Sequence, residues 1–257
     1  IKGAQNQKEV LSIAAELVRR GKILAVKAVG GFQLWVDARN DSTLKRLREL
    51  KMRRRKPFVL LVENQCKALE LAQLTEQEKA LLDSPQNPIV ICDRNENSYR
   101  LSNEVCFSSR RLGLMLPASG TQILLANKIK VPVVVTSLNH ERDPIVYRDN
   151  DLESHCHYFD YVLTDNLDRV RGLEDSIIQC GLGDARNEQM LRIGRGYSPQ
   201  VFEIDLENCQ NKDKKQCEKN IRIGLGSELK STISIYNSIQ KTAVTYEQMG
   251  DTLSCET

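Results

Sequence analysis

The sequence predicts an α/β fold, one twisted open sheet flanked by helices. Short apolar runs typical of strands alternate along the chain with helical patterns of apolar residues. With 257 residues, 40% apolar and 28% charged, the chain can bury a sizeable core and is neither disordered nor fibrous. No apolar run approaches the about 18 residues that a membrane helix needs, so no membrane partner is expected.

The first part of the chain predicts two helices and three strands, separated by turn residues. Gly21 is a natural C-cap for the helix before it. Gly30-Gly31 divides an apolar run into two strands, and the polar Asn40-Asp41-Ser42 caps the basic helix that follows. In order, we expect a helix over residues 10–20, strands over 22–29 and 32–38, a helix that runs through Lys51 and a strand over 58–62.

The rest of the chain continues this alternation. Thr75 and Glu78 have the spacing of a capping box at the start of a helix. The polar, charged residues 205–220 are typical of a linker, and residues 221–235 predict two short strands around a turn. We expect helices over residues 65–74, 75–82 and 121–128, and strands over 87–92, 131–136 and 158–163.

Neither the cysteines nor the histidines predict a metal or a nucleophile. The eight cysteines are scattered without a CxxC pair, so we expect reduced thiols in a cytoplasmic protein. His155-Cys156-His157 lacks further ligands at a supporting spacing, and residues 181–184 (GLGD) predict a hairpin turn rather than a dinucleotide site. No Ser/His/Asp or Cys/His arrangement is evident, so hydrolysis through a nucleophile is not expected.

Positive charge is concentrated near the N-terminus. Residues 1–60 hold 15 Lys and Arg against 5 Asp and Glu, although the whole chain has a net charge of only +3. Lys51, Arg53 and Lys56 fall between a helix and a strand, and several cations on one loop suit a triphosphate. Nucleic-acid phosphates would use the same residues, and a solvated basic turn is the remaining alternative.

Two further positions predict contact with a polar or anionic ligand. Lys27 lies on an otherwise apolar strand, so it either reaches solvent or faces an anion, and we favour the anion. Thr136-Ser137-Leu138-Asn139 follows a buried strand at its C-terminal end, where ligands of open α/β sheets collect. Ordinary turn chemistry is the alternative for the second position.

Taken in order, six segments resemble the YrdC-like domain of the HypF carbamoyltransferases. The tail, GLGSELKSTISI (224–235) with MGD (249–251), is similar to the start of the Kae1-like domain that follows in HypF. The resemblance divides the chain into a YrdC-like nucleotide- and carbamoyl-binding domain (1–204), a polar linker (205–220) and the truncated start of a Kae1-like domain (221–257). Because the chain opens on Ile1, we expect a piece of a longer protein. The six segments are KAVGGFQLWVDARN (27–40), LRELKMRRRKPFVLLV (47–62), LGLMLP (112–117), VPVVVTSLN (131–139), LEDSII (173–178) and RIGRGYSP (192–199).

The resemblance implies a twisted sheet with a large concave basic face and an ATP-dependent reaction. Carbamate from carbamoyl phosphate would join ATP to give carbamoyl-adenylate, with Mg²⁺ bridging the phosphates and no side-chain nucleophile. A hydrogenase-maturation partner protein is implied for a full-length HypF. Lys56, Ser137 and Asn139 are the implied catalytic residues. The implied ligand-binding residues are Lys27, Lys51, Arg53, Lys56, Leu116, Pro117, Thr136, Ser137, Asn139, Ser176 and Arg195.

Five positions depart from the HypF pattern and keep two other functions open. The first is a degenerate module that binds nucleotide or double-stranded RNA without chemistry. The second is threonylcarbamoyl-adenylate synthesis for tRNA modification, which Gly30-Gly31-Phe32 disfavours because the related synthases carry Thr and Tyr there. The departures are Gln33 for His, Leu138 for Gly, Gly172 for Arg, Glu174 at the first of two acidic positions, and Ile193 for Arg.

Overall fold

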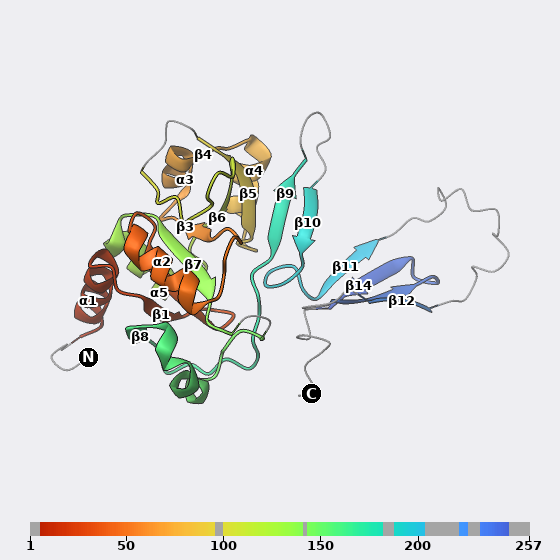
Figure 1. Ribbon diagram of the computed structural model, residues 1–257. Helices are drawn as coiled ribbons and strands as arrows, with labels where there is room; N and C mark the ends of the chain where they lie inside the picture. Colours follow the sequence, from red (N-terminus) through yellow and green to blue (C-terminus); the bar gives the residue numbers. More distant parts are fainter. Residues whose placement is uncertain are drawn as a thin grey trace.

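The main body of the protein is one mixed sheet of ten strands with helices on both faces (Figure 1). The computed structural model describes residues 6–95, 100–140, 143–181, 188–203, 221–225 and 232–246. The strand order is β10-β9-β5-β6-β3-β7-β2-β1-β8, with β4 paired to β5, and the predicted α/β class is confirmed. The strands are β1 (Leu24–Lys27), β2 (Phe32–Asp37), β3 (Val59–Leu61), β4 (Ala72–Gln73), β5 (Ile89–Arg94), β6 (Arg111–Met115), β7 (Val133–Ser137), β8 (Tyr161–Leu163), β9 (Ile177–Cys180) and β10 (Glu188–Arg192).

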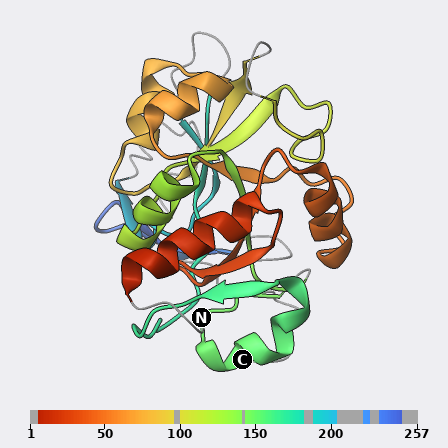
Figure 2. The ribbon, with the colours of Figure 1, turned by 90° about the vertical axis from the view of Figure 1, so that its left-hand side faces the viewer.

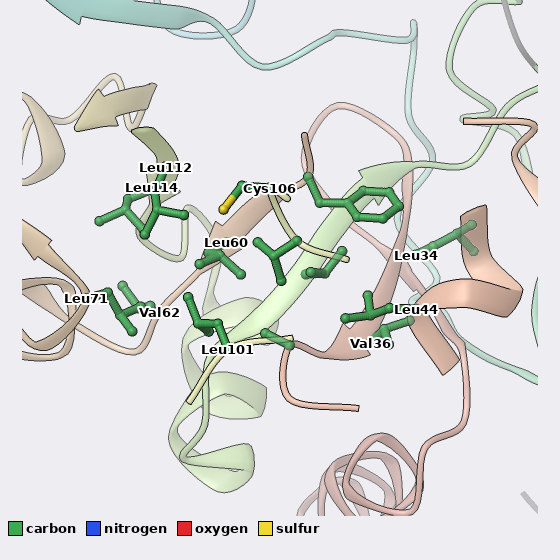
Figure 3. Close-up of a cluster of buried hydrophobic side chains, with 14 of the residues drawn as sticks. Leu34, Val36, Leu44, Leu60, Val62, Leu71, Leu101, Cys106, Leu112 and Leu114 are labelled. Atoms are coloured by element: carbon green, nitrogen blue, oxygen red, sulfur yellow. The ribbon is translucent and has the colours of Figure 1, made fainter. Parts of the chain in front are cut away.

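Two hydrophobic clusters lie on opposite faces of this sheet. In β2, Leu34 and Val36 pack into one cluster and Trp35 packs into the other, as the alternation of a strand requires. Figure 3 shows part of the first cluster, to which α2, α3 and α4 contribute, and Figure 2 shows α1 and α5 side by side over the other face. The helices are α1 (Gln7–Arg19), α2 (Asp41–Leu50), α3 (Gln65–Leu71), α4 (Glu76–Leu82) and α5 (Gly120–Ile129).

Each helix begins at a polar cap that the sequence carries. The Asn40 side chain accepts a hydrogen bond from the Thr43 backbone N–H, which confirms the predicted cap of α2. Thr75 and Glu78 make both hydrogen bonds of the capping box at the start of α4. The side chains of Asn6, Asn64 and Ser119 cap the other three helices in the same way.

Two predicted elements overlap an element of a different kind in the structure. The helix expected over 65–74 ends at Leu71, because residues 72–73 instead form β4 against β5. The strand expected from residue 158 begins at Tyr161, because Tyr158 closes the 3₁₀ helix η1 (Asp149–Tyr158). The sequence of η1 is polar and has no apolar periodicity, so it does not predict a helix. The sequence patterns also do not predict the strands β6, β9, β10, β11 (Gln200–Glu203) and β14 (Thr242–Thr245).

A second sheet of four antiparallel strands follows β10 and has the order β11-β14-β13-β12 (Figure 1). Its strands are β11 (Gln200–Glu203), β12 (Ile221–Leu225), β13 (Ile233–Asn237) and β14 (Thr242–Thr245). β12 pairs with β13, which confirms the two short strands predicted from residue 221, although β13 extends past residue 235 to Asn237. The predicted linker at 205–220 and all but Gly181 of the predicted turn at 181–184 lie outside the described residues.

Five of the eight cysteines lie in the part of the chain that the structure describes. Cys66, Cys92, Cys106, Cys156 and Cys180 are free thiols, and the other three cysteines lie outside the described residues. Burial raises the pKa of the Cys180 thiol to about 11 and raises the pKa of Cys92 further. Within the described ranges, no helix is long and apolar enough to cross a membrane.

Candidate functional site

The C-terminal end of β7 meets the loop after α2 through a buried lysine. Lys51, at the C-terminus of α2, is 7% exposed. Its ammonium donates to the Ser137 carbonyl (3.0 Å), to the Asn139 side-chain Oδ1 (2.8 Å) and to the Asn139 carbonyl. A cation that the sequence assigns to a phosphate therefore holds the 137–139 turn in place. We name Lys51, Arg53, Thr136, Ser137 and Asn139 the β7 cluster.

Ser137 and Asn139 form a hydroxyl–amide pair within the β7 cluster. The Ser137 hydroxyl donates to Asn139 Oδ1 over 2.8 Å, and the Asn139 Nδ2 donates to the Asp143 carbonyl over 2.7 Å. The Asn139 orientation is thus set at both ends of its amide. With its proton directed at Asn139, the Ser137 hydroxyl presents its two lone pairs as acceptors.

Arg53 binds the same strand end from the loop after α2. Its guanidinium donates to Thr136 Oγ1 over 3.1 Å and to the carbonyls of Lys56 and Pro57. Burial is the largest cause that lowers the pKa of Arg53 to about 10, followed by repulsion from Arg48 and Arg192. Two of the charges that act on Arg53 are thus cations, and an anion bound here would relieve their repulsion.

Arg48 shapes this loop from inside the protein. It is 7% exposed and lies between the rings of Phe58 and Phe107, at 4.4 and 4.3 Å from their centroids. One guanidinium nitrogen donates to the Arg53 carbonyl (2.7 Å) and to the Lys56 carbonyl (3.2 Å). Burial lowers the pKa of Arg48, and Glu104 opposes this through an ion pair of 3.1 Å. The side chains of Arg54, Arg55 and Lys56 are exposed.

A second group of predicted site residues gathers around Asp175. The Asp175 carboxylate accepts from Arg195 Nε over 2.8 Å and from Gln33 Nε2 over 3.0 Å. Arg195 also donates to two backbone carbonyls at the start of β5, those of Gln86 and Asn87. Ser176 is fully buried and donates to the Arg195 carbonyl. We name Gln33, Gln122, Asp175, Ser176 and Arg195 the Asp175 cluster.

Gly30 brings the Asp175 cluster against β2. The Gly30 carbonyl accepts from the Leu173 N–H over 2.8 Å, and a Cβ at Gly30 would lie 2.0 Å from the Leu173 carbonyl oxygen. Only glycine permits this approach. The close approach at Gly30 is therefore made by the protein's own backbone.

Lys27 lies apart from both clusters. It is 2% exposed and forms an ion pair with Asp149 of η1 at 2.8 Å, with Asp165 at 4.0 Å. Lys27 therefore faces an anion rather than solvent, but that anion is a carboxylate of the same chain and not a ligand. A ligand role for Lys27 stays a prediction.

The remaining predicted positions are placed as follows. Leu138 is fully buried and packs into the same hydrophobic cluster as Val134, so its side chain points into the core rather than toward a ligand. A Cβ at Gly172 would lie 2.9 Å from the side chain of Ile145, which leaves little room there for an arginine. Leu116 and Pro117 are half-buried between β6 and α5, and Ile193 is half-buried after β10.

Comparison with known proteins identifies the family. Residues 16–194 match the model of the Sua5, YciO and YrdC proteins, described as telomere recombination. That match covers more than half of the chain. The chain belongs to the Sua5/YciO/YrdC family. The matched residues include both clusters described above except Arg195, which follows the match directly.

Within that family, the chain is similar to curated carbamoyltransferases named HypF. The carbamoyltransferase HypF of Synechocystis is 28% identical over 250 residues, which cover 97% of this chain and 30% of that protein. The HypF of Rhizobium leguminosarum is 31% identical and covers 84% of this chain and 27% of that protein. The resemblance to HypF given by the sequence motifs is confirmed. The chain spans about a third or less of the length of these relatives.

A solved structure has the same fold. Full-length HypF in a phosphate- and nucleotide-bound form superposes with a TM-score of 0.79 at 27% identity, over 94% of this chain and 36% of that one. This agreement confirms the twisted sheet flanked by helices. The concave basic face that the resemblance implies stays a prediction.

The sequence did not single out several residues that organise the site. Arg48 had a detectable signal, because it lies one turn after Leu44 on the buried face of α2, where a charge needs partners. Gln122 and Arg192 had none, since their partners are distant in sequence. Arg192 donates to the Asp175 carbonyl and pairs with Glu174 at 3.4 Å. A β-bulge between Met190 and Arg192 interrupts the strand register just before this position.

Proposed function

We propose that this chain carries out the first half of a HypF-type carbamoyl transfer, the ATP-dependent formation of carbamoyl-adenylate. The observation that carries the proposal is the β7 cluster, where an oriented hydroxyl–amide pair adjoins a guanidinium repelled by neighbouring cations. The HypF relatives support the choice of carbamoyl phosphate and ATP as substrates. The finer assignment of Lys56, Ser137 and Asn139 as catalytic residues belongs to this proposal.

The proposed reaction needs positioning and charge neutralisation rather than a protein nucleophile. Carbamoyl phosphate first reacts with water to give carbamate and inorganic phosphate. A carbamate oxygen then attacks the α-phosphorus of ATP, and the bond from that phosphorus to the bridging oxygen breaks. Pyrophosphate leaves with the bond electrons, so the cations of the β7 cluster and Lys56 would neutralise charge that grows on the leaving group.

Mg²⁺ fits this site only through the phosphates. Among the described residues, no three His, Cys, Asp or Glu side chains are grouped as metal ligands. Two carboxylates at the Asp175 cluster, those of Glu174 and Asp175, are paired with Arg192 and Arg195. When bound, Mg²⁺ would therefore supply charge neutralisation on phosphate oxygens, as it does in other phosphoryl-transfer sites.

Pyrophosphate release tests the proposal directly. MgATP is incubated with the chain plus carbamoyl phosphate, plus threonine and bicarbonate, or alone. We expect release only with carbamoyl phosphate, and its loss in Lys56→Ala. Lys45→Ala is the matched control, because Lys45 is an exposed lysine of α2 outside the β7 cluster. Release with threonine and bicarbonate instead would assign threonylcarbamoyl-adenylate synthesis.

The exposed basic loop favours one second candidate, a module that binds nucleotide or double-stranded RNA without chemistry. Arg54, Arg55 and Lys56 are consecutive and exposed beside the β7 cluster. No pyrophosphate release with retained ATP binding would support this candidate over the enzyme. A salt titration separates its two ligands, because RNA held through many phosphates loses affinity steeply with salt and a single ATP loses far less.

A further inference from the structure

A line of buried and partly buried hydrogen bonds connects the segment before α5 with Arg195, and Gln33 is its central link. The Ala118 N–H donates to Gln122 Oε1 over 2.8 Å. Gln122 Nε2 donates to Gln33 Oε1 over 3.1 Å, and Gln33 Nε2 donates to Asp175 Oδ2 over 3.0 Å. Asp175 Oδ1 then accepts from Arg195. The line thus crosses from α5, through β2, to the residues that flank β9 and β10.

The groups at the two ends of this line determine which atom donates and which accepts in each hydrogen bond. The backbone N–H of Ala118 can only donate, so Gln122 must present its oxygen to Ala118 and its nitrogen to Gln33. At the other end, the Asp175 carboxylate between Arg195 and Gln33 can only accept. Position 33 must therefore offer an acceptor to Gln122 and a donor to Asp175, and an amide does both.

Burial makes the loss of any of these hydrogen bonds costly in free energy. Gln122 is 1% exposed and Gln33 is 6% exposed, so water cannot readily replace a lost partner. Gln33 is also the cross-strand neighbour of Ser137 in the β2–β7 pair. As a member of the Asp175 cluster, Gln33 therefore connects that cluster with the β7 cluster.

We propose that Gln33 is a positioning residue that sets the spacing between residues 116–118 and Arg195, and through it the affinity for nucleotide. The nucleotide as ligand rests on the proposed function. The mechanical part does not, because it concerns only how two segments of this chain are held. If Gln33 acts in this way, its removal loosens both segments at once.

The first test compares Gln33→Met with the wild-type chain without ligand. Methionine keeps the length of the side chain and removes both hydrogen bonds. We expect faster hydrogen exchange in residues 116–122 and also in residues 192–197, read by mass spectrometry. Gln73→Met, at an exposed glutamine of β4, is the matched control and should change neither segment. A change confined to one segment, or absent from both, overturns the proposal.

The second test uses Gln33→His, because a neutral imidazole also has one donor and one acceptor, whereas an imidazolium has two donors. We expect ATP affinity near wild type at pH 8 and, at pH 6, a loss approaching that of Gln33→Met, each divided by the wild-type value at the same pH. The groups that face position 33 are Gln122 and Asp175, and Asp175 is flanked by Arg195, Arg192 and Glu174.

The expected loss for Gln33→Met is roughly tenfold or more in ATP affinity, as for an unpaired buried amide. Equal affinity in Gln33→Met and wild type, or no difference between Gln33→His and Gln33→Met at pH 8, overturns the positioning role. If Gln33→Met does not fold, the two pH values for Gln33→His decide. If the wild-type chain binds no ATP, the proposed function fails by itself, and the exchange experiment still decides whether Gln33 couples the segments.

Discussion

The β7 cluster and the Asp175 cluster each hold cations, but they bind them with different oxygens. In the β7 cluster, Lys51 and Arg53 donate to carbonyl, amide and hydroxyl oxygens, which are neutral. In the Asp175 cluster, Arg195 pairs with a carboxylate, so its charge is compensated inside the protein. Neutral oxygens orient a cation without cancelling its charge. The β7 cluster is therefore suited to attract an anion, and the Asp175 cluster is suited to hold its shape.

The largest effect that would test this contrast is expected from Lys51→Met. The substitution removes one donor from each of three oxygens of Ser137 and Asn139 and removes a charge from the β7 cluster. We expect pyrophosphate release to fall at least about 100-fold and the free energy of unfolding to fall by about 3 kcal/mol. Urea unfolding and the release assay measure the two effects. Unchanged release in a folded Lys51→Met chain would contradict the proposed role of the β7 cluster, and Lys45→Met is the control.

A smaller effect is expected from Arg53→Met, because it removes a single guanidinium. ATP affinity should fall roughly 10- to 100-fold, the value of a charge-assisted hydrogen bond. Arg54→Met removes the same charge from the neighbouring exposed position and should weaken binding about threefold or less. Calorimetric titration with ATP measures both. Equal losses in the two variants would mean that general positive charge, and not the placement of Arg53, governs binding.

The lowered pKa of Arg53 gives this prediction a pH dependence. Since the pKa is about 10, the free chain loses the Arg53 proton as pH rises through 10, and ATP affinity should fall there. A bound anion stabilises the protonated form and raises the pKa, so binding near pH 10 should take up protons. Titrations in two buffers of different ionisation enthalpy measure this uptake, which Arg53→Met should reduce.

Asp175→Asn tests the Asp175 cluster by its effect on the free energy of unfolding. Gln33 and Arg195 bind different oxygens of Asp175, and asparagine replaces one of these oxygens with an NH₂ group, so one of the two donors then faces an N–H group. We expect the free energy of unfolding to fall by roughly 1–3 kcal/mol. Asp93→Asn is the control, because Asp93 is a more exposed carboxylate that pairs with Arg111 at 3.3 Å. A cost for Asp175→Asn no larger than that of the control would contradict a structural role for the Asp175 cluster.

The smallest effect on the reaction is expected from Lys27→Met. Lys27 is paired with Asp149, as Arg195 is paired with Asp175, so its loss should cost about 1–2 kcal/mol of stability. Pyrophosphate release should stay within about threefold of wild type. Abolished release in a stable Lys27→Met chain would instead assign Lys27 the ligand role that the sequence predicts.

Local patterns predicted much of the fold because their causes are local. The cap at Asn40 and the capping box at Thr75 depend on residues three positions away, and both are confirmed. β9 and η1 were missed for the opposite reason. β9 is four residues long and is a strand because β5 and β10 lie on its two sides, while η1 is held by contacts such as Asp149 with Lys27.

Periodicity, capping and motif spacing can be read along one dimension, so they predict the α/β class, the helix starts at Asn40 and Thr75 and the segments that carry the HypF resemblance. Which oxygen each cation contacts depends instead on the tertiary structure. Lys27, Lys51 and Arg195 read alike as cations near a ligand, yet their partners lie at least 20 residues away in sequence. Burial forces each charge to find a partner, and the folding of distant segments together decides whether that partner is a carboxylate, a neutral oxygen or a position left for an anion.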